Sequence, residues 1–219
     1  HTHSPDVHLV GRIYFHLVEN KRQDYPFAFL ATYSTHIDKH GKSKHLPLKH
    51  ALTEYGKDSG KLLELLSTVH LAAKESDRIS HLLDSGELFH PLAWDEKEAY
   101  RFLKEIPIYE KYGILCRIPN WWKPASSPCK VHIQLGGKTE SLVGMDAVLD
   151  FRVDLLLDDV PITEEEARRL LEEADGLAYI KGKWIAVDAG KLKQTLDAYE
   201  NARKLMEDKN LSLRDALRL

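Results

Sequence analysis

Apolar and polar residues alternate in several short segments of the chain, and this alternation predicts β-strands. Near the start, Leu9, Ile13, Phe15 and Leu17 fall on one side of an extended segment. The same period of two recurs over residues 27–33, 131–135 and 147–155. Successive side chains of a strand point to opposite faces, so each segment can bury one face and leave the other polar. We therefore expect half-buried strands.

Other segments carry apolar residues every three to four positions, which is typical of amphipathic helices. The clearest helix starts are two capping boxes, Asp95 with Glu98 and Thr163 with Glu166. We expect helices around Leu62–Val69, over Ser76–Leu83, and after Asp95, Thr163, Asp188 and Ser212. Strands and helices do not alternate regularly, so the predicted fold class is α+β, with mostly antiparallel sheets packed against amphipathic helices.

Two connecting segments refine this picture. Lys181-Gly182-Lys183 separates two apolar runs and predicts a β-hairpin. Residues 35–49 are expected to form a polar loop, with His36, His40, His45 and His50 near its ends. We treat residues 1–219 as a single accessory region, and residues 119–128, rich in Pro and Ser, are where a boundary would fall if the chain divides.

Composition places the chain among ordinary globular proteins, with 43% hydrophobic and 30% charged residues among 219. Its net charge of −3 gives no general attraction to nucleic acid, so any such binding requires a local patch. Two cysteines fit a reducing, cytoplasmic environment, and no apolar run is long enough to predict a membrane span. The chain lacks an initiator Met, and the apolar stripe after Ser212 stops early, which predicts an excised part of a longer protein.

Two glycine-containing segments imitate phosphate-binding loops, but neither matches the motif. The segment 56–62 has three residues between its glycines where four are needed, and Leu62 stands in place of the magnesium-binding Ser or Thr. The segment 136–139 ends correctly, but His132 occupies the position of the first glycine. We interpret both as turns and expect no ATP site here.

Metal and nucleophile patterns are equally incomplete. The four histidines at 36–50 have spacings that impose no geometry, and Cys116, Cys129 and His132 supply three ligands where a structural zinc needs four. A Cys–His pair from the same residues has no third group to orient it, and no G-x-S-x-G elbow is present. We predict no catalytic residues and no metal site.

Charge distribution is more informative. Residues 111–138 contain five Lys or Arg residues and no acidic residue, with two adjacent tryptophans in the middle. Cations neutralise phosphates and indole rings stack on bases, so this pattern is typical of nucleic-acid contact. The candidate residues are Arg117, Trp121, Trp122, Lys123, Lys130, His132 and Lys138. In the alternative interpretation, the tryptophans anchor a core or an interface and the lysines are merely solvated. The acidic run over 158–175 is interpreted as a solvated helix face.

Several segments in order resemble a known family. They are Phe27–Tyr33, His45–Leu48, Leu88–Trp94, Ala99–Leu103, Arg117–Lys123, Gly144–Ala147 with Asp150-Phe151, and Lys181–Trp184. Together they resemble the helicase-associated region N-terminal to the motor of bacterial Swi/Snf-type superfamily II ATPases. The resemblance extends from about Phe27 to Leu219 and implies no catalytic residues in this region.

The resemblance implies that an ATP-driven DNA translocase core follows in the parent protein, with ATP and Mg²⁺ bound only there and no cofactor in this region. The leading hypothesis is a non-catalytic accessory domain that packs on or regulates a helicase-type ATPase core in cis. A second hypothesis is a module that presents DNA or RNA to that motor. A third, more remote one is a free-standing metal-dependent enzyme. None of the three involves a membrane.

Overall fold

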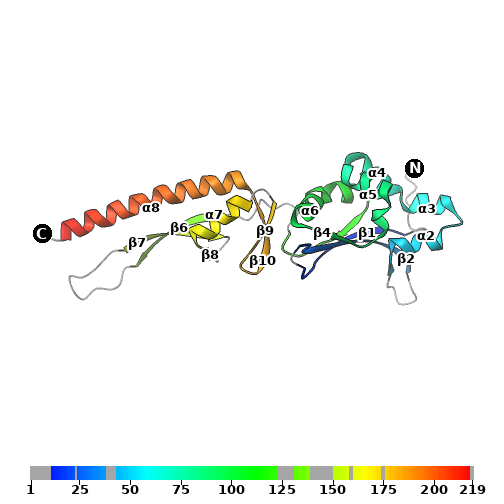
Figure 1. The fold of residues 1–219 in the computed structure, drawn as a ribbon, viewed down its shortest axis with the longest axis horizontal. Helices are drawn as coiled ribbons and strands as arrows, with labels where there is room; N and C mark the ends of the chain where they lie inside the picture. Colours follow the sequence, from blue (N-terminus) through cyan, green and yellow to red (C-terminus); the bar gives the residue numbers. More distant parts are fainter. Residues whose placement is uncertain are drawn as a thin grey trace. The chain divides into compact units, whose positions relative to one another are not determined.

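The structure is a computed structural model, and it describes residues 11–22, 24–37, 43–122, 131–138, 150–157, 160–173 and 176–217 (Figure 1). The chain divides into two compact units, residues 1–124 (unit 1) and 125–219 (unit 2), so the division falls within the stretch 119–128. Each unit combines helices with mostly antiparallel strands. The predicted α+β class is confirmed.

Unit 1 is built on a five-stranded sheet. Its central strand, β1 (Ile13–Glu19), pairs antiparallel with β2 (Phe27–Ile37) and parallel with β5 (Leu115–Arg117). The other edge of β2 pairs with β3 (Ser43–Pro47) and β4 (Leu92–Trp94), one after the other. Strand β1 buries alternate residues, as its sequence pattern predicts.

Helices cover one face of this sheet (Figure 1). They are α2 (Leu48–Glu54), α3 (Ser59–Leu65), α4 (Ser67–Glu75), α5 (Asp77–Ser85) and α6 (Glu96–Lys111), with a 3₁₀ turn, η1, over Glu87–Phe89. The predicted cap of α6 is confirmed, because the Glu98 N–H donates to Asp95 Oδ1 at 2.8 Å. Ser76 caps α5 in the same way, by accepting a hydrogen bond from the Ile79 N–H. Helix α5 ends at Gly86, whose φ of 79° suits glycine.

Aromatic side chains form the centre of the unit 1 core. The Phe15 ring lies 5.4 Å from the rings of both Phe29 and Tyr109, and Phe29 stacks on Trp94 at 4.5 Å. Phe102 from α6 contacts the rings of Phe15, Phe29, Trp94 and Tyr109. Such rings bury a large apolar area each. These ring contacts fix helix α6 against the sheet. Among the described residues of this unit, no helix lies on the opposite face of the sheet.

Unit 2 contains a three-stranded sheet and a separate hairpin. Strand β7 (Asp150–Leu157) pairs antiparallel with β6 (Val131–Lys138) and β8 (Val160–Ile162). The hairpin joins β9 (Gly176–Ile180) to β10 (Lys183–Val187), as predicted. Two helices accompany them, α7 (Glu164–Glu173) and α8 (Ala189–Leu217). The Thr163–Glu166 capping box is confirmed, because each backbone N–H donates to the other side chain at 3.1 Å.

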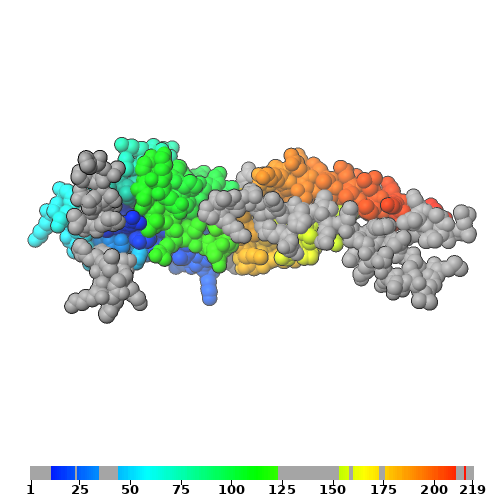
Figure 2. Space-filling model, turned by 180° about the vertical axis from the view of Figure 1, so that it is seen from behind, coloured from blue at the N-terminus to red at the C-terminus, as the bar shows by residue number. Residues whose placement is uncertain are grey.

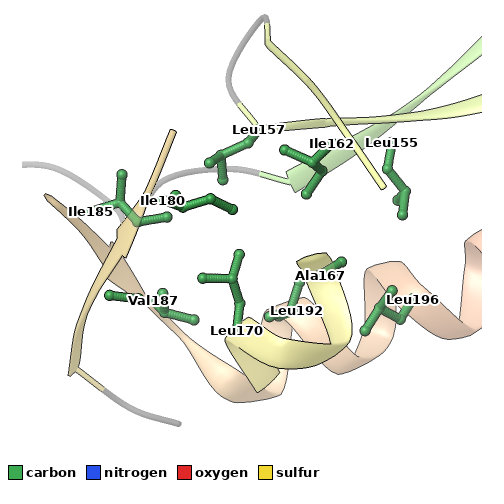
Figure 3. Close-up of a cluster of buried hydrophobic side chains, with 11 residues drawn as sticks. Leu155, Leu157, Ile162, Ala167, Leu170, Ile180, Ile185, Val187, Leu192 and Leu196 are labelled. Carbon is green, nitrogen blue, oxygen red and sulfur yellow. The ribbon is translucent and has the colours of Figure 1, made fainter. Parts of the chain in front are cut away.

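The core of unit 2 is aliphatic. Figure 3 shows buried side chains from the strands β7 to β10 and from both helices pointing toward a common centre. The cluster consists of Leu155, Leu157, Ile162, Ala167, Leu170, Ala178, Ile180, Ile185, Val187, Leu192 and Leu196. Every member belongs to unit 2, so this unit has a hydrophobic core of its own.

Several local predictions were wrong. The expected polar loop over 35–49 includes the end of β2, strand β3 and the start of α2, because pairing along the edge of β2 overrides the polar composition. The helix around Leu62–Val69 is two helices, α3 and α4, with Leu66 between them. No new helix begins at Ser212, since the helix-forming residues on both sides allow α8 to continue through it. Gly136 and Gly137 lie in strand β6 rather than in a turn.

Candidate nucleic-acid interface

The face of the unit 1 sheet opposite the helices carries polar and aromatic side chains. On β1 the buried residues alternate with Tyr14, His16 and Val18, which point to this second face. We call it the open face. On the neighbouring strand β5, Arg117 pairs in register with His16 and is exposed. Val18 remains 53% exposed.

Five side chains on the open face lie close together. The rings of Tyr14 and His45 meet edge to face with centroids 4.4 Å apart. The Arg117 guanidinium carbon lies 5.4 Å from the centroid of the Tyr14 ring, at cation–π distance. Next to them, His16 Nε2 and Thr32 Oγ1 are 2.7 Å apart. Strands β1, β2, β3 and β5 thus each contribute to one cluster.

The electrostatics of this cluster are one-sided. Burial lowers the pKa of His16, and the neighbouring Arg117 and His45 lower it further because they disfavour another positive charge. Among the five strands of the sheet, the sequence contains a single acidic residue, Glu19. Glu19 accepts a hydrogen bond from the Trp121 indole N–H. The cluster therefore attracts an anion more readily than a cation.

A groove of about 640 Å³ lies beside the cluster, along the ends of β1 and β5 and the segment that follows β5. His16, Val18, Glu19 and Arg117 line it on the strands, and Pro119 and Trp121 line it on the following segment. The groove combines cationic and apolar walls with one carboxylate, Glu19, which accepts a hydrogen bond from the Trp121 indole. Such a surface can accept a ligand that has a phosphate on one side and a flat ring on the other.

Comparison with known proteins adds the family. Residues 87–219 match the family model described as SNF2 Helicase protein, and this range is more than half of the chain. The chain belongs to this family. It is 29% identical over 154 residues to the Bacillus subtilis (strain 168) protein named "Putative ATP-dependent helicase/translocase YwqA". The alignment covers 66% of the chain but only 16% of that relative. No solved structure matches the chain.

The family match includes unit 2 and the C-terminal part of unit 1 from η1 onward. Of the open-face cluster, it contains Arg117, whereas Tyr14, His16, Thr32 and His45 precede the matched range. The family therefore gives context for the chain but assigns no role to this cluster.

The predicted nucleic-acid residues are distributed over both units. Arg117 lies on the open face of unit 1, and Trp121 lines the groove next to it. His132 and Lys138 belong to strand β6 of unit 2, and their side chains lie outside the described residues, as do Lys123 and Lys130. Nucleic-acid contact by this set stays a prediction.

The two tryptophans are half-buried and contact other side chains of unit 1. The ring of Trp121 lies 6.1 Å from that of Phe27, and its indole N–H is bonded to Glu19. The ring of Trp122 lies 6.2 Å from that of Tyr100 on α6, edge to face. These contacts match the interpretation of the tryptophans as anchors. They attach the segment after β5 to the sheet and to α6.

Sequence patterns alone do not predict most of the open-face cluster. Tyr14 and His16 occupy the polar positions of the alternation that predicts β1. The alternation therefore places them on one face of the strand, but it does not indicate a binding role for them. The sequence predicts a loop at His45. The contact between the His45 and Tyr14 rings depends on the pairing of β3 with β2, which no local pattern reveals. Register between distant strands is decided by tertiary packing.

Other candidate chemistry can be placed only in part. Burial, assisted by Glu110, raises the pKa of the Cys116 thiol to about 12, which keeps it protonated and poorly nucleophilic at neutral pH. Cys129 lies outside the described residues. Within the described ranges, no group of three or more His, Cys, Asp or Glu side chains comes together as a metal site would need. None of the helices described could cross a membrane.

Proposed function

We propose that this chain is a non-catalytic accessory domain of a Swi/Snf-type DNA-dependent ATPase, where it packs on or regulates the motor in cis. The comparison with the Bacillus subtilis relative carries the proposal. That protein is named as a helicase and translocase, and the aligned region is 16% of its length. The greater part of such a protein is available for a motor that binds ATP and Mg²⁺.

An exposed tyrosine beside a half-buried tryptophan in unit 2 supports a docking role. Tyr179 on β9 and Trp184 on β10 face each other across the hairpin, with ring centroids 5.2 Å apart. Tyr179 is 60% exposed, although it is a large aromatic side chain. Exposed aromatic residues of this kind are enriched among the residues that dominate protein interfaces. We assign this pair to contact with the motor.

The hairpin is held in a defined conformation. Lys181 and Gly182 both have positive φ, 52° and 79°, which gives a tight turn whose twist matches that of the strands. Lys181 Nζ also lies 3.5 Å from Glu166 Oε1 on α7. Beneath the turn, Ile180 and Ile185 belong to the buried cluster. A rigid support of this kind lowers the entropic cost of docking.

The test is DNA-stimulated ATP hydrolysis by the full-length gene product, compared with the same protein lacking residues 1–219. We expect both proteins to hydrolyse ATP, with a different DNA concentration dependence or maximal rate in the deletion. A Tyr179→Ser variant of the full-length protein should shift the rate in the direction of the deletion. The matched control is Tyr25→Ser, which removes another exposed tyrosine, 48% exposed, from unit 1.

Two results would contradict the proposal. ATP turnover by the 219-residue chain alone would make it an enzyme rather than an accessory domain. Identical DNA-stimulated rates for the full-length protein and the deletion would leave the chain without a role at the motor.

A further inference from the structure

We propose that the open face of the unit 1 sheet binds single-stranded nucleic acid, with phosphates at Arg117 and His16 and bases against the Tyr14–His45 pair and the adjoining groove. This goes beyond the accessory role proposed above and does not depend on it. The charge, the ring geometry and the exposure of this face support such binding.

Charge favours a polyanion. The five strands contain one acidic residue, Glu19, and its carboxylate already accepts from the Trp121 indole. Arg117 is exposed and contacts the Tyr14 ring, and among the described residues no salt bridge to an acidic group is found for it. His16 lies beside Arg117 in the strand register. A phosphate could bind the exposed Arg117 guanidinium without displacing a carboxylate, and the His16 ring, whose Nε2 is 2.7 Å from Thr32 Oγ1, lies beside it.

A second cation extends the surface along β1. Arg12 precedes β1 and is exposed, and its carbonyl accepts a hydrogen bond from the Ser34 N–H at 2.8 Å. It comes two residues before Tyr14, so the alternation of the strand places it on the open face. Arg12 and Arg117 therefore allow two phosphate contacts, with His16 as a third when it is protonated.

Flat and apolar groups favour single strands over a duplex. The Tyr14 and His45 rings form an edge-to-face pair, Leu115 pairs with Tyr14 and is 37% exposed, and Val18 further along β1 is 53% exposed. Bases of a single strand can lie on such a surface, whereas the bases of a duplex are stacked on one another and present only their edges. The neighbouring strands also form a continuous surface along which an extended chain of nucleotides can lie.

The experiment is fluorescence anisotropy of a labelled oligothymidylate of about 15 nucleotides titrated with the complete 219-residue chain at low salt. Matched arms use oligouridylate and a duplex of equal length. We expect both single strands to bind more tightly than the duplex. With two to three phosphate contacts, the slope of log affinity against log salt should be about −1.4 to −2.

Variants localise the surface. Arg117→Gln should weaken binding about tenfold and reduce the salt slope by about 0.7, because one phosphate contact is lost. Tyr14→Leu should weaken binding about tenfold with an unchanged slope, since it removes stacking but no charge. The controls are Arg101→Gln on α6, exposed on the helical side of the unit, and Tyr25→Leu between β1 and β2. Figure 2 shows the blue segment that joins β1 to β2 projecting beyond the green atoms. Both controls should bind normally.

A measurement on the unaltered chain covers the case in which a variant does not fold. Photo-crosslinking with a thiothymidine oligonucleotide, followed by mass spectrometry, should label peptides of β1, β3 and β5. Equal loss of binding in Arg117→Gln and Arg101→Gln, preference for the duplex, no binding at low salt, or crosslinks confined to unit 2 would each overturn the proposal.

Discussion

The two units stabilise themselves in different ways. Unit 1 packs aromatic rings between its sheet and helices, with Phe102 contacting Phe15, Phe29, Trp94 and Tyr109. Unit 2 uses short aliphatic side chains from strands and helices that are close in sequence. The difference is also visible at the surface. Unit 1 leaves one sheet face with cationic and aromatic groups, whereas the hairpin of unit 2 exposes Tyr179 beside the half-buried Trp184. The comparison indicates two separate cores that support two kinds of contact surface.

The largest expected effect is on unit 1. Replacing Phe102 with Ala removes a ring that contacts four other aromatic rings and leaves a cavity, so the free energy of unfolding of unit 1 should fall by about 3–5 kcal/mol. Denaturant unfolding followed by hydrogen exchange should show the loss in unit 1 alone. Equal loss in unit 2 would show that the two cores are not independent.

The converse change concerns unit 2. Leu170 is 4% exposed in the aliphatic cluster, and Leu170→Ala should lower the free energy of unfolding of unit 2 by about 2–5 kcal/mol. The same hydrogen-exchange measurement should leave the amides of β1 and α6 protected as before. The control Leu205→Ala alters a leucine on α8 that is 67% exposed and should change stability little.

A smaller effect is expected at a helix start. Asp95→Ala removes the acceptor for the Glu98 N–H at the beginning of α6, and should cost unit 1 about 0.5–2 kcal/mol. Asp95→Ser restores a capping oxygen and should recover most of the loss. If both variants are equally destabilised in thermal unfolding, Asp95 does not stabilise unit 1 through the helix cap.

The smallest effect is a dependence on pH. The pKa of His16 is lower in the folded chain than in the unfolded one, so the unfolded chain takes up this proton first as the pH falls. His16 therefore leaves stability intact above its unfolded pKa of about 6.5 and reduces it as the pH falls from there through the folded pKa. In denaturant unfolding of His16→Gln, the loss of stability between about pH 7.5 and about pH 5.5 should be smaller than in the unaltered chain. An identical loss would show that His16 does not contribute.

Much of this fold is predictable from local patterns, while the candidate site is not. The helix cap at Asp95, the capping box at Thr163 and the Lys181-Gly182 hairpin are encoded within a few residues, and the structure has all three. Strand β3 has too little alternation to be identified, since it is stabilised by pairing with β2. The open-face cluster draws on residues up to about a hundred positions apart, from Tyr14 to Arg117. Its existence depends on the parallel pairing of β1 with β5, which has no local signature.

We propose that this chain acts on a motor through its surfaces. The most direct measurement uses the deletion variant of the gene product that lacks residues 1–219. The purified chain is added to it in trans, and DNA-dependent ATP hydrolysis is followed. We expect a saturable change in the hydrolysis rate as the chain is added, and a weaker change with Tyr179→Ser. No change at any concentration of chain, together with ATP turnover by the chain itself, would contradict it.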